Sequence, residues 1–184
     1  MKRYQIALLV FAAAIFIGAS LMAVLFGVKD KNSKNSIFSE SGLDYDKYNV
    51  VKVFFSNNIT DPETLYCDKT YPTERNISVI KGYDTSILGE IAYLALAELL
   101  SGPTQDEVKK GFFTSISKDA GIKRITIKDG VAMVDFNSEL NKGFAGSCKV
   151  QAIRSQITET LKQFPGIEEV VISVEGEVEG VLEP

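Results

Sequence analysis

The chain has 184 residues, a net charge of −4 and 45% hydrophobic residues, and it contains neither histidine nor tryptophan. The lack of histidine removes the commonest general base and the commonest metal ligand, which disfavours most acid–base and metal-dependent enzymes. The acidic balance lacks the basic footprint of a nucleic-acid-binding protein. Composition therefore favours a protein with no metal, no cofactor and no nucleic-acid partner.

An uncharged, apolar run from residue 4 to residue 28 follows Lys2 and Arg3. As a helix it would span about 37 Å, which is enough to cross a hydrocarbon core of roughly 30 Å. A cleaved signal peptide is the alternative, but its apolar stretch is usually shorter and ends at small residues. We expect residues 1–28 to be a single uncleaved transmembrane anchor in the cell membrane, with the following domain outside the cytoplasm.

Residues 29–47 are rich in Lys, Asn, Ser and Asp, which is typical of a flexible linker. The remainder, residues 48–184, is long enough to form one hydrophobic core. The β-branched and aromatic run at 50–55 predicts a buried strand. Turn-forming residues dominate 60–76 and predict a long loop, and the alternation at 77–81 predicts a short second strand.

Two segments with apolar residues at helical spacing predict the main helices. The first covers residues 87–99 and stops at Gly102, which the following proline reinforces. The second covers residues 147–164. Between them, Thr104 and Glu107 have the spacing of a capping box, which predicts one short helical turn.

The remaining strands follow from alternation and from turn chemistry. Runs at 122–127 and 131–136 flank an Asp-Gly pair at 129–130, a strong hairpin signal. A last core strand is predicted at 169–174 and a short edge strand at 179–182. The order predicts an α/β (α+β) fold in which two main helices lie on one face of a small mixed sheet.

Several of these segments together resemble one known family, the GerMN domain of sporulation, spore-germination and envelope lipoproteins. The matching segments are VKVFFSN (51–57), LAELLSGPTQDE (96–107), GFFTSI (111–116), ITIKDGVAMVDFNSEL (125–140) and IRSQITETLKQFPGIEEVVISVEG (153–176). The resemblance implies an extracytoplasmic domain with an α-β-β-α-β core similar to the ring-building modules of secretion machines. It also implies a non-enzymatic role in assembling envelope complexes, through other envelope proteins or further copies of the chain. The chain departs from the family in its expected transmembrane anchor, which stands where relatives carry a lipidated cysteine.

Cys67 and Cys148 are the two cysteines of the chain. In an oxidising compartment they would pair, and the closed loop would stabilise the fold by about 4 kcal/mol in the chain-entropy model. The alternative is two separate buried thiols. A redox or metal site is disfavoured, because there is no C-x-x-C spacing and no histidine to complete a ligand set.

Candidate binding residues are Asp68, Glu74 and Arg75 in the predicted polar loop, and Phe112 and Phe113 in a predicted loop between the helices. The polar group would bind a partner or a small ligand; alternatively, the loop is simply solvated and Arg75 pairs with a nearby carboxylate. The two phenylalanines are either exposed contact residues or part of the core. No catalytic residue is predicted. An extracytoplasmic sensor of cell-wall fragments, using the 60–76 loop, is the alternative function.

Overall fold

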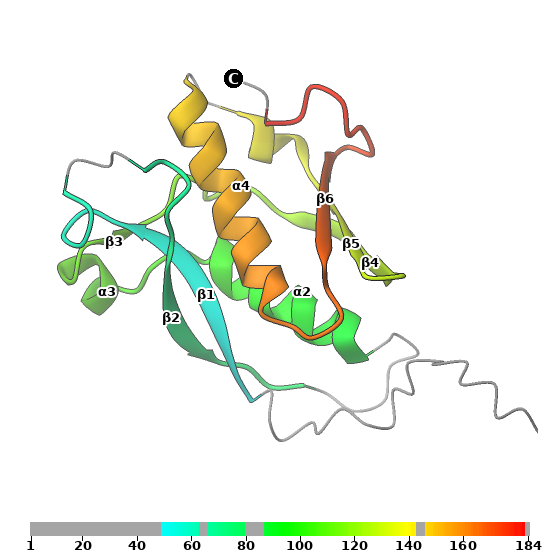
Figure 1. Cartoon of the computed structure of the whole chain (residues 1–184), viewed down its shortest axis with the longest axis horizontal. Helices are drawn as coiled ribbons and strands as arrows, with labels where there is room; N and C mark the ends of the chain where they lie inside the picture. Colours follow the sequence, from blue (N-terminus) through cyan, green and yellow to red (C-terminus); the bar gives the residue numbers. More distant parts are fainter. Residues whose placement is uncertain (1–48, 63–65, 80–86, 143–145, 183–184) are drawn as a thin grey trace, which may run out of the picture. The chain divides into compact units, whose positions relative to one another are not determined.

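The computed structural model describes residues 49–62, 66–79, 87–142 and 146–182 (Figure 1). The predicted anchor at 1–28 and the predicted linker at 29–47 lie outside the described residues. Within the part of the chain that is described, no helix is long and apolar enough to cross a membrane.

A first sheet contains β1 (Val50–Asn57), β2 (Tyr71–Asn76) and β3 (Phe112–Phe113), in the order β2-β1-β3. Both pairings are antiparallel. The predicted strand at 50–55 is confirmed, and its alternate side chains Val51, Val53 and Phe55 are buried. Alternation along β1 therefore supplies the core with one face of this sheet.

The second strand was predicted at the wrong place. The structure has β2 at Tyr71–Asn76, inside the segment predicted as a loop, and residues 77–79 are not in a strand. Pro72 suggested a turn, but β2 is an edge strand that pairs with β1 alone, and proline is tolerated there. Phe112 and Phe113 were likewise predicted in a loop; as β3 they pair with the end of β1.

A second sheet contains β4 (Ile122–Lys128), β5 (Val131–Phe136) and β6 (Glu169–Val174). The β4–β5 hairpin is confirmed, with positive φ values of 50° at Asp129 and 82° at Gly130. Because β6 runs parallel to β5, the sheet is mixed as predicted. The expectation of a single sheet was wrong, since the described strands form two separate sheets of three.

The main helices are α2 (Ile87–Leu100) and α4 (Ser147–Lys162), with the short α3 (Gln105–Lys109) between them and a 3-10 helix, η3 (Ser138–Asn141), after β5. Figure 1 shows α4 between the two sheets, and α4 contacts both β1 and β6. The second helix, α2, contacts α4, β1 and β4. The helix pair therefore fills the space between the sheets, and the order α2-β4-β5-α4-β6 confirms the α-β-β-α-β core.

The edge strand predicted at 179–182 is absent, because these residues form turns. Val181 and Leu182 instead insert into the core, at 2% and 1% exposure. Their backbone carbonyl oxygens accept hydrogen bonds from the guanidinium group of Arg154, at 2.6 and 3.2 Å. This apolar pair, which follows a glycine, therefore packs into the core. The hydrogen bonds from Arg154 satisfy its backbone carbonyl groups, so it needs no partner strand.

Candidate functional site

A disulfide joins Cys67, in the segment before β2, to Cys148, in the first turn of α4. The two Cα atoms are 4.9 Å apart, and the residues are 81 positions apart in the sequence. Of the two alternatives that the sequence left open, the structure contains the paired one. The bond holds the segment after β1 against the start of a core helix.

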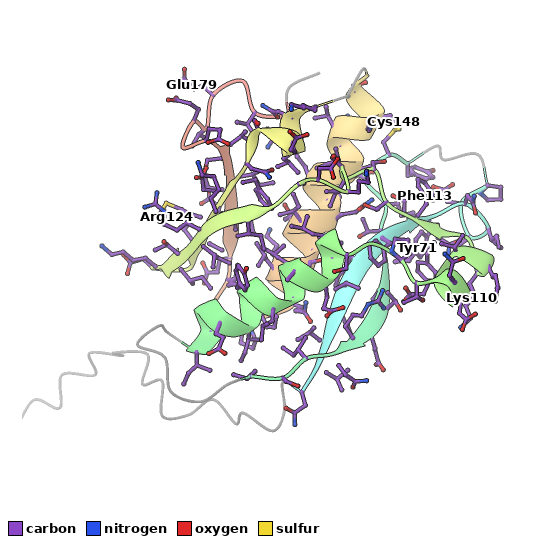
Figure 2. The ribbon with its side chains drawn as sticks, turned by 180° about the vertical axis from the view of Figure 1, so that it is seen from behind. Tyr71, Lys110, Phe113, Arg124, Cys148 and Glu179 are labelled. Atoms are coloured by element: carbon purple, nitrogen blue, oxygen red, sulfur yellow. A yellow bond between two sulfur atoms is a disulfide. The ribbon has the colours of Figure 1, made fainter. Side chains whose placement is uncertain are left out.

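A cavity of about 330 Å³ lies beside this disulfide, and we call it the disulfide pocket. It is lined at the end of β1, at the start of β2, at β3 and at the first turn of α4. Its described lining residues are Ser56, Asn57, Asp61, Tyr66, Cys67, Lys69, Tyr71, Phe113, Ser115, Gly146, Cys148, Lys149 and Ala152. Figure 2 shows Tyr71, Phe113 and Cys148 gathered at one end of the fold.

Aromatic rings and a lysine form one wall of the disulfide pocket. The Lys69 Nζ atom lies 5.5 Å from the ring centroid of Tyr66 and 5.8 Å from that of Tyr71. An ammonium group in this position is attracted by both ring faces. The two rings therefore hold a positive charge at the pocket wall, where a ligand would meet it.

The hydroxyl group of Tyr71 is buried and has no hydrogen-bond partner among the described residues. A buried hydroxyl of this kind normally finds a donor or acceptor, because leaving it unpaired costs free energy. Tyr71 also lines the disulfide pocket. The residue that carries this buried, unpartnered hydroxyl thus also borders a largely apolar cavity.

A second cluster joins β2 to α3 through Arg75 and Glu107. The Arg75 Nη2 atom donates to Glu107 Oε2 at 2.6 Å, and the Arg75 Nε atom lies 3.5 Å from Glu98 Oε2. The guanidinium group also lies over the ring of Phe55, 5.8 Å from its centroid. Glu107 is 8% exposed, so this ion pair is nearly buried.

The Glu107 carboxylate stays charged in spite of this burial. Burial alone would raise its pKa, but hydrogen bonds from Arg75 and from Thr73 and Thr104 outweigh that effect and lower the pKa to about 2. The hydrogen bond to Glu107 in turn raises the pKa of Arg75. Glu107 also completes the capping box of α3 with Thr104, as the sequence predicted. The cluster is a structural joint between two elements.

The structure brings only some of the predicted binding residues together. Phe113 lines the disulfide pocket, whereas its neighbour Phe112 packs against the core. Asp68 is exposed beside the pocket in a shallow depression with Tyr66 and Lys69. Glu74 and Arg75 lie elsewhere, because β2 carries them away: Glu74 is exposed and pairs in register with Lys52, and Arg75 is engaged by Glu107.

Sequence reasoning missed the tyrosines and lysines of the disulfide pocket. Tyr66 is next to Cys67 in the sequence, Lys69 lies two positions after Cys67, and Lys149 is next to Cys148. If the two cysteines form a disulfide, the residues near each of them in the sequence must lie close together in space. Nearness to the cysteines was therefore the sequence signal for these pocket residues. No spacing rule marks Tyr71, which lies in the segment predicted as a loop.

Among the described residues there is no group of three or more Cys, Asp or Glu side chains that would hold a metal ion. The geometry instead offers a cavity with aromatic walls, a positive charge and unused hydrogen-bonding capacity. A concave, largely apolar cavity with a few polar groups has the general character of a ligand pocket, and here it lies on a mixed α/β fold.

One family model matches the part of the chain that forms this fold. A family model described as Germane, sporulation and spore germination, matches residues 49–180, and the chain therefore belongs to this GerMN-type family. No curated protein matches the chain.

Solved structures with a similar fold include the tandem GerMN domains of the sporulation protein GerM from Bacillus subtilis, at 23% identity and a TM-score of 0.50. That match covers 70% of this chain and 39% of the tandem-domain chain, so the protein spans well under half the length of that relative. The first GerMN domain of GerM alone matches at 20% identity and a TM-score of 0.45, covering 70% of this chain and 84% of that one. A putative lipoprotein from Clostridium perfringens matches at 17% identity and a TM-score of 0.45, with 70% and 75% covered.

Proposed function

We propose that this protein is a non-enzymatic, membrane-anchored assembly module whose GerMN-type domain lies outside the cytoplasm and associates with further copies of itself in the cell envelope. The apolar run at 4–28 supports the anchor, because its length suits one crossing of a bilayer. The disulfide supports an oxidising compartment, because such bonds persist there and are rare in the cytosol. A role in sporulation or germination is what the family suggests.

The observation that carries the assembly proposal is the uncovered face of the β4–β5–β6 sheet, which we call the outer sheet face. The two main helices pack on the opposite face, while the side chains on this one are exposed or half-buried. They are Arg124, Thr126 and Lys128 of β4, Val131, Met133 and Asp135 of β5, and Glu169, Val171 and Ser173 of β6. Figure 2 shows the Arg124 side chain projecting from the edge of this sheet.

The outer sheet face has an apolar centre with charges of opposite sign on its two sides. Met133, on the central strand, is 47% exposed and has Val171 as its register partner on β6. On β4, Arg124 and Lys128 are both exposed, and on β6, Glu169 is exposed. The basic strand β4 therefore forms one edge of the sheet and the acidic strand β6 the other, with a strip of apolar side chains between them.

The outer strands of this pattern are complementary to each other, whereas Asp135, on the central strand, would lie opposite its own copy. A two-fold axis parallel to the strands would stack two outer sheet faces so that β4 of each copy lies over β6 of its partner. Lys128 shares its register row with Glu169, so the axis sets each Lys128 opposite the partner's Glu169 and brings the two Met133 side chains together. Charge complementarity of this kind selects the partner and its register.

The outer sheet face is small, roughly 300 Å² for three strands of six residues at the usual spacing and rise. Free domains would therefore associate weakly. Anchoring in a membrane raises the effective concentration of neighbouring copies, which compensates for a small interface. The assembly is thus expected in the membrane, with much less of it in dilute detergent solution.

Crosslinking tests the assembly proposal. Met133→Cys, in the full chain in native membranes, should yield disulfide-linked dimers on mild oxidation, because the axis brings the two side chains together. Tyr93→Cys on α2 is the matched control, since Tyr93 is 44% exposed and lies away from the outer sheet face. Equal crosslinking by both variants, or none by Met133→Cys, would count against the proposed interface.

The anchor and its orientation are tested separately. Intact cells would be treated with a membrane-impermeant thiol reagent, with and without prior reduction, and the chain resolved on a gel that separates anchored from clipped forms. Labelling that needs reduction and reaches the full-length chain is expected. Labelling only after lysis would place the domain in the wrong compartment for this proposal, and labelling of intact cells without reduction would show that the thiols are free.

A second candidate function is an extracytoplasmic sensor for cell-wall fragments. The disulfide pocket favours it, because a cavity of about 330 Å³ with aromatic walls and an unpartnered hydroxyl is suited to a small polar ligand. The two functions use different surfaces and are compatible.

A further inference from the structure

Positive charge converges on the disulfide pocket. Lys69 and Lys149 both line it, and Asp61 is the one carboxylate residue among its described lining residues. Lys69 reaches the pocket from the segment before β2, and Lys149 reaches it from α4. Two elements far apart in the sequence thus bring cations to one cavity, within a chain whose overall charge is −4.

The first turn of α4 opens on the same cavity, because Gly146 and Cys148 also line it. This helix has 16 residues, no side-chain cap at Gly146 and no acidic residue in its first turn. A helix N-terminus carries a partial positive charge that acidic side chains normally offset. Here a lysine stands in that turn instead, so the first turn of α4 contributes a side-chain charge as well as the helix dipole to this side of the pocket.

The Tyr71 hydroxyl is an independent indication of a ligand. It is buried without a hydrogen-bond partner among the described residues, next to a cavity that it helps to line. A bound molecule with a hydroxyl, amide or carboxylate group would supply the missing partner. Such unpaired buried groups are uncommon in folded proteins and call for an explanation.

The walls of the disulfide pocket indicate the shape of the ligand. Tyr66, Tyr71 and Phe113 contribute aromatic rings to these walls, and Tyr66 is 62% exposed although it is a large aromatic residue. Flat faces suit another ring, such as the C–H face of a pyranose, better than a flexible chain. The volume of about 330 Å³ lies at the small end of ligand pockets, so it suits a monosaccharide-sized molecule.

We infer that the disulfide pocket binds a small ring-shaped molecule that carries a carboxylate, of the class of acidic amino sugars. The carboxylate meets Lys69, Lys149 and the first turn of α4, the ring lies against the tyrosines, and a polar substituent pairs with the Tyr71 hydroxyl. This inference rests on the second candidate function, and it names the ligand class for that pocket.

N-acetylmuramic acid and N-acetylglucosamine are the probes that test it, because they share a ring and an acetamide group and differ by the lactyl ether that bears the carboxylate. Each is titrated into the full chain in detergent micelles, by calorimetry or ligand-observed NMR. N-acetylmuramic acid should bind, and N-acetylglucosamine should bind about tenfold more weakly, since it lacks the charge-assisted contacts.

Two variants separate a ligand contact from a structural role. Lys69→Gln should weaken binding of N-acetylmuramic acid about tenfold and leave N-acetylglucosamine nearly unchanged, whereas the control Lys118→Gln, with its lysine 90% exposed and outside the pocket, should change neither. Tyr71→Phe should lower the affinity for N-acetylmuramic acid severalfold while leaving thermal stability equal or higher, because it removes an unpaired buried hydroxyl.

The outcomes distinguish a failure of the proposed ligand class from a failure of the second candidate function. Equal binding of both sugars would overturn the carboxylate assignment and leave a glycan-binding pocket in place. Binding of neither sugar to the wild-type chain would overturn both. Loss of affinity in Tyr71→Phe together with a lower thermal midpoint would show that the hydroxyl acts in the fold, against its assignment as a ligand contact.

Discussion

Arg75 and Glu107, 32 residues apart in the sequence, form a nearly buried ion pair that joins the edge strand β2 to the short helix α3. Side-chain exposure is 11% for Arg75 and 10% for Glu107. Removing one partner from a buried pair leaves an uncompensated charge, which costs far more than the loss of a surface pair. The joint therefore matters for stability, and it also sets the position of α3 beside β3, which carries Phe113.

Glu107→Gln should lower the free energy of unfolding at pH 7 by about 3 kcal/mol, because Arg75 would keep its charge and lose its main partner. Chemical denaturation of the full chain would measure the effect. The matched control is Glu98→Gln, since Glu98 is 37% exposed and lies 3.5 Å from the same guanidinium group; its cost should stay below about 1 kcal/mol. If Glu98→Gln lowered the free energy of unfolding as much as Glu107→Gln does, the buried pair would have no special role in stability.

The same carboxylate predicts a pH dependence of stability. Its pKa is about 2 in the folded domain, against the 4.5 that is usual for a glutamate side chain, so the folded state favours the charged form. The stabilisation, on the order of 3 kcal/mol, is complete above about pH 4.5 and is lost as the pH falls towards 2. Thermal midpoints of the wild type and Glu107→Gln should therefore converge between pH 5 and pH 2. A constant gap over that range would contradict the low pKa.

Replacement of both cysteines, Cys67→Ser with Cys148→Ser, should lower the free energy of unfolding by about 4 kcal/mol, because the unfolded chain is no longer closed into a long loop. Wild-type protein treated with a reductant should unfold at the same denaturant concentration as the double variant. The double variant itself should be insensitive to the reductant. If the reductant shifts the double variant as well, its effect does not come from this disulfide.

Gly111→Ala should be strongly destabilising for two reasons. Its φ of 86° is costly for any other residue, and a Cβ atom there would lie 2.7 Å from side-chain atoms of Asn58 and Ile59. The conformational part costs roughly 1 to 2 kcal/mol, and steric overlap adds about 1 to 3 kcal/mol. Gly176→Ala isolates the first part, because Gly176 has a φ of 88° and nothing within 4 Å of its Cβ position. If the two variants lost equal thermal stability, steric overlap at the Cβ position of residue 111 would contribute nothing.

The family and the order of core elements could be predicted from the sequence, and so could several local features. The capping box of Thr104 and Glu107, the Asp129-Gly130 hairpin and the end of α2 at Gly102 are all confirmed. Each depends on hydrogen bonds and backbone angles within a few residues. Local chemistry of this kind is nearly independent of what packs around it.

What the tertiary structure decided concerns residues far apart in the chain. Pro72 suggested a turn, yet Tyr71–Asn76 is a strand because β1 lies beside it and supplies the hydrogen bonds. The division into two sheets, the choice of Glu107 as the partner of Arg75, and the meeting of Tyr71 with the disulfide all depend on that packing. Burial and pairing energies between distant segments exceed local turn preferences, and they become known only when the chain is folded.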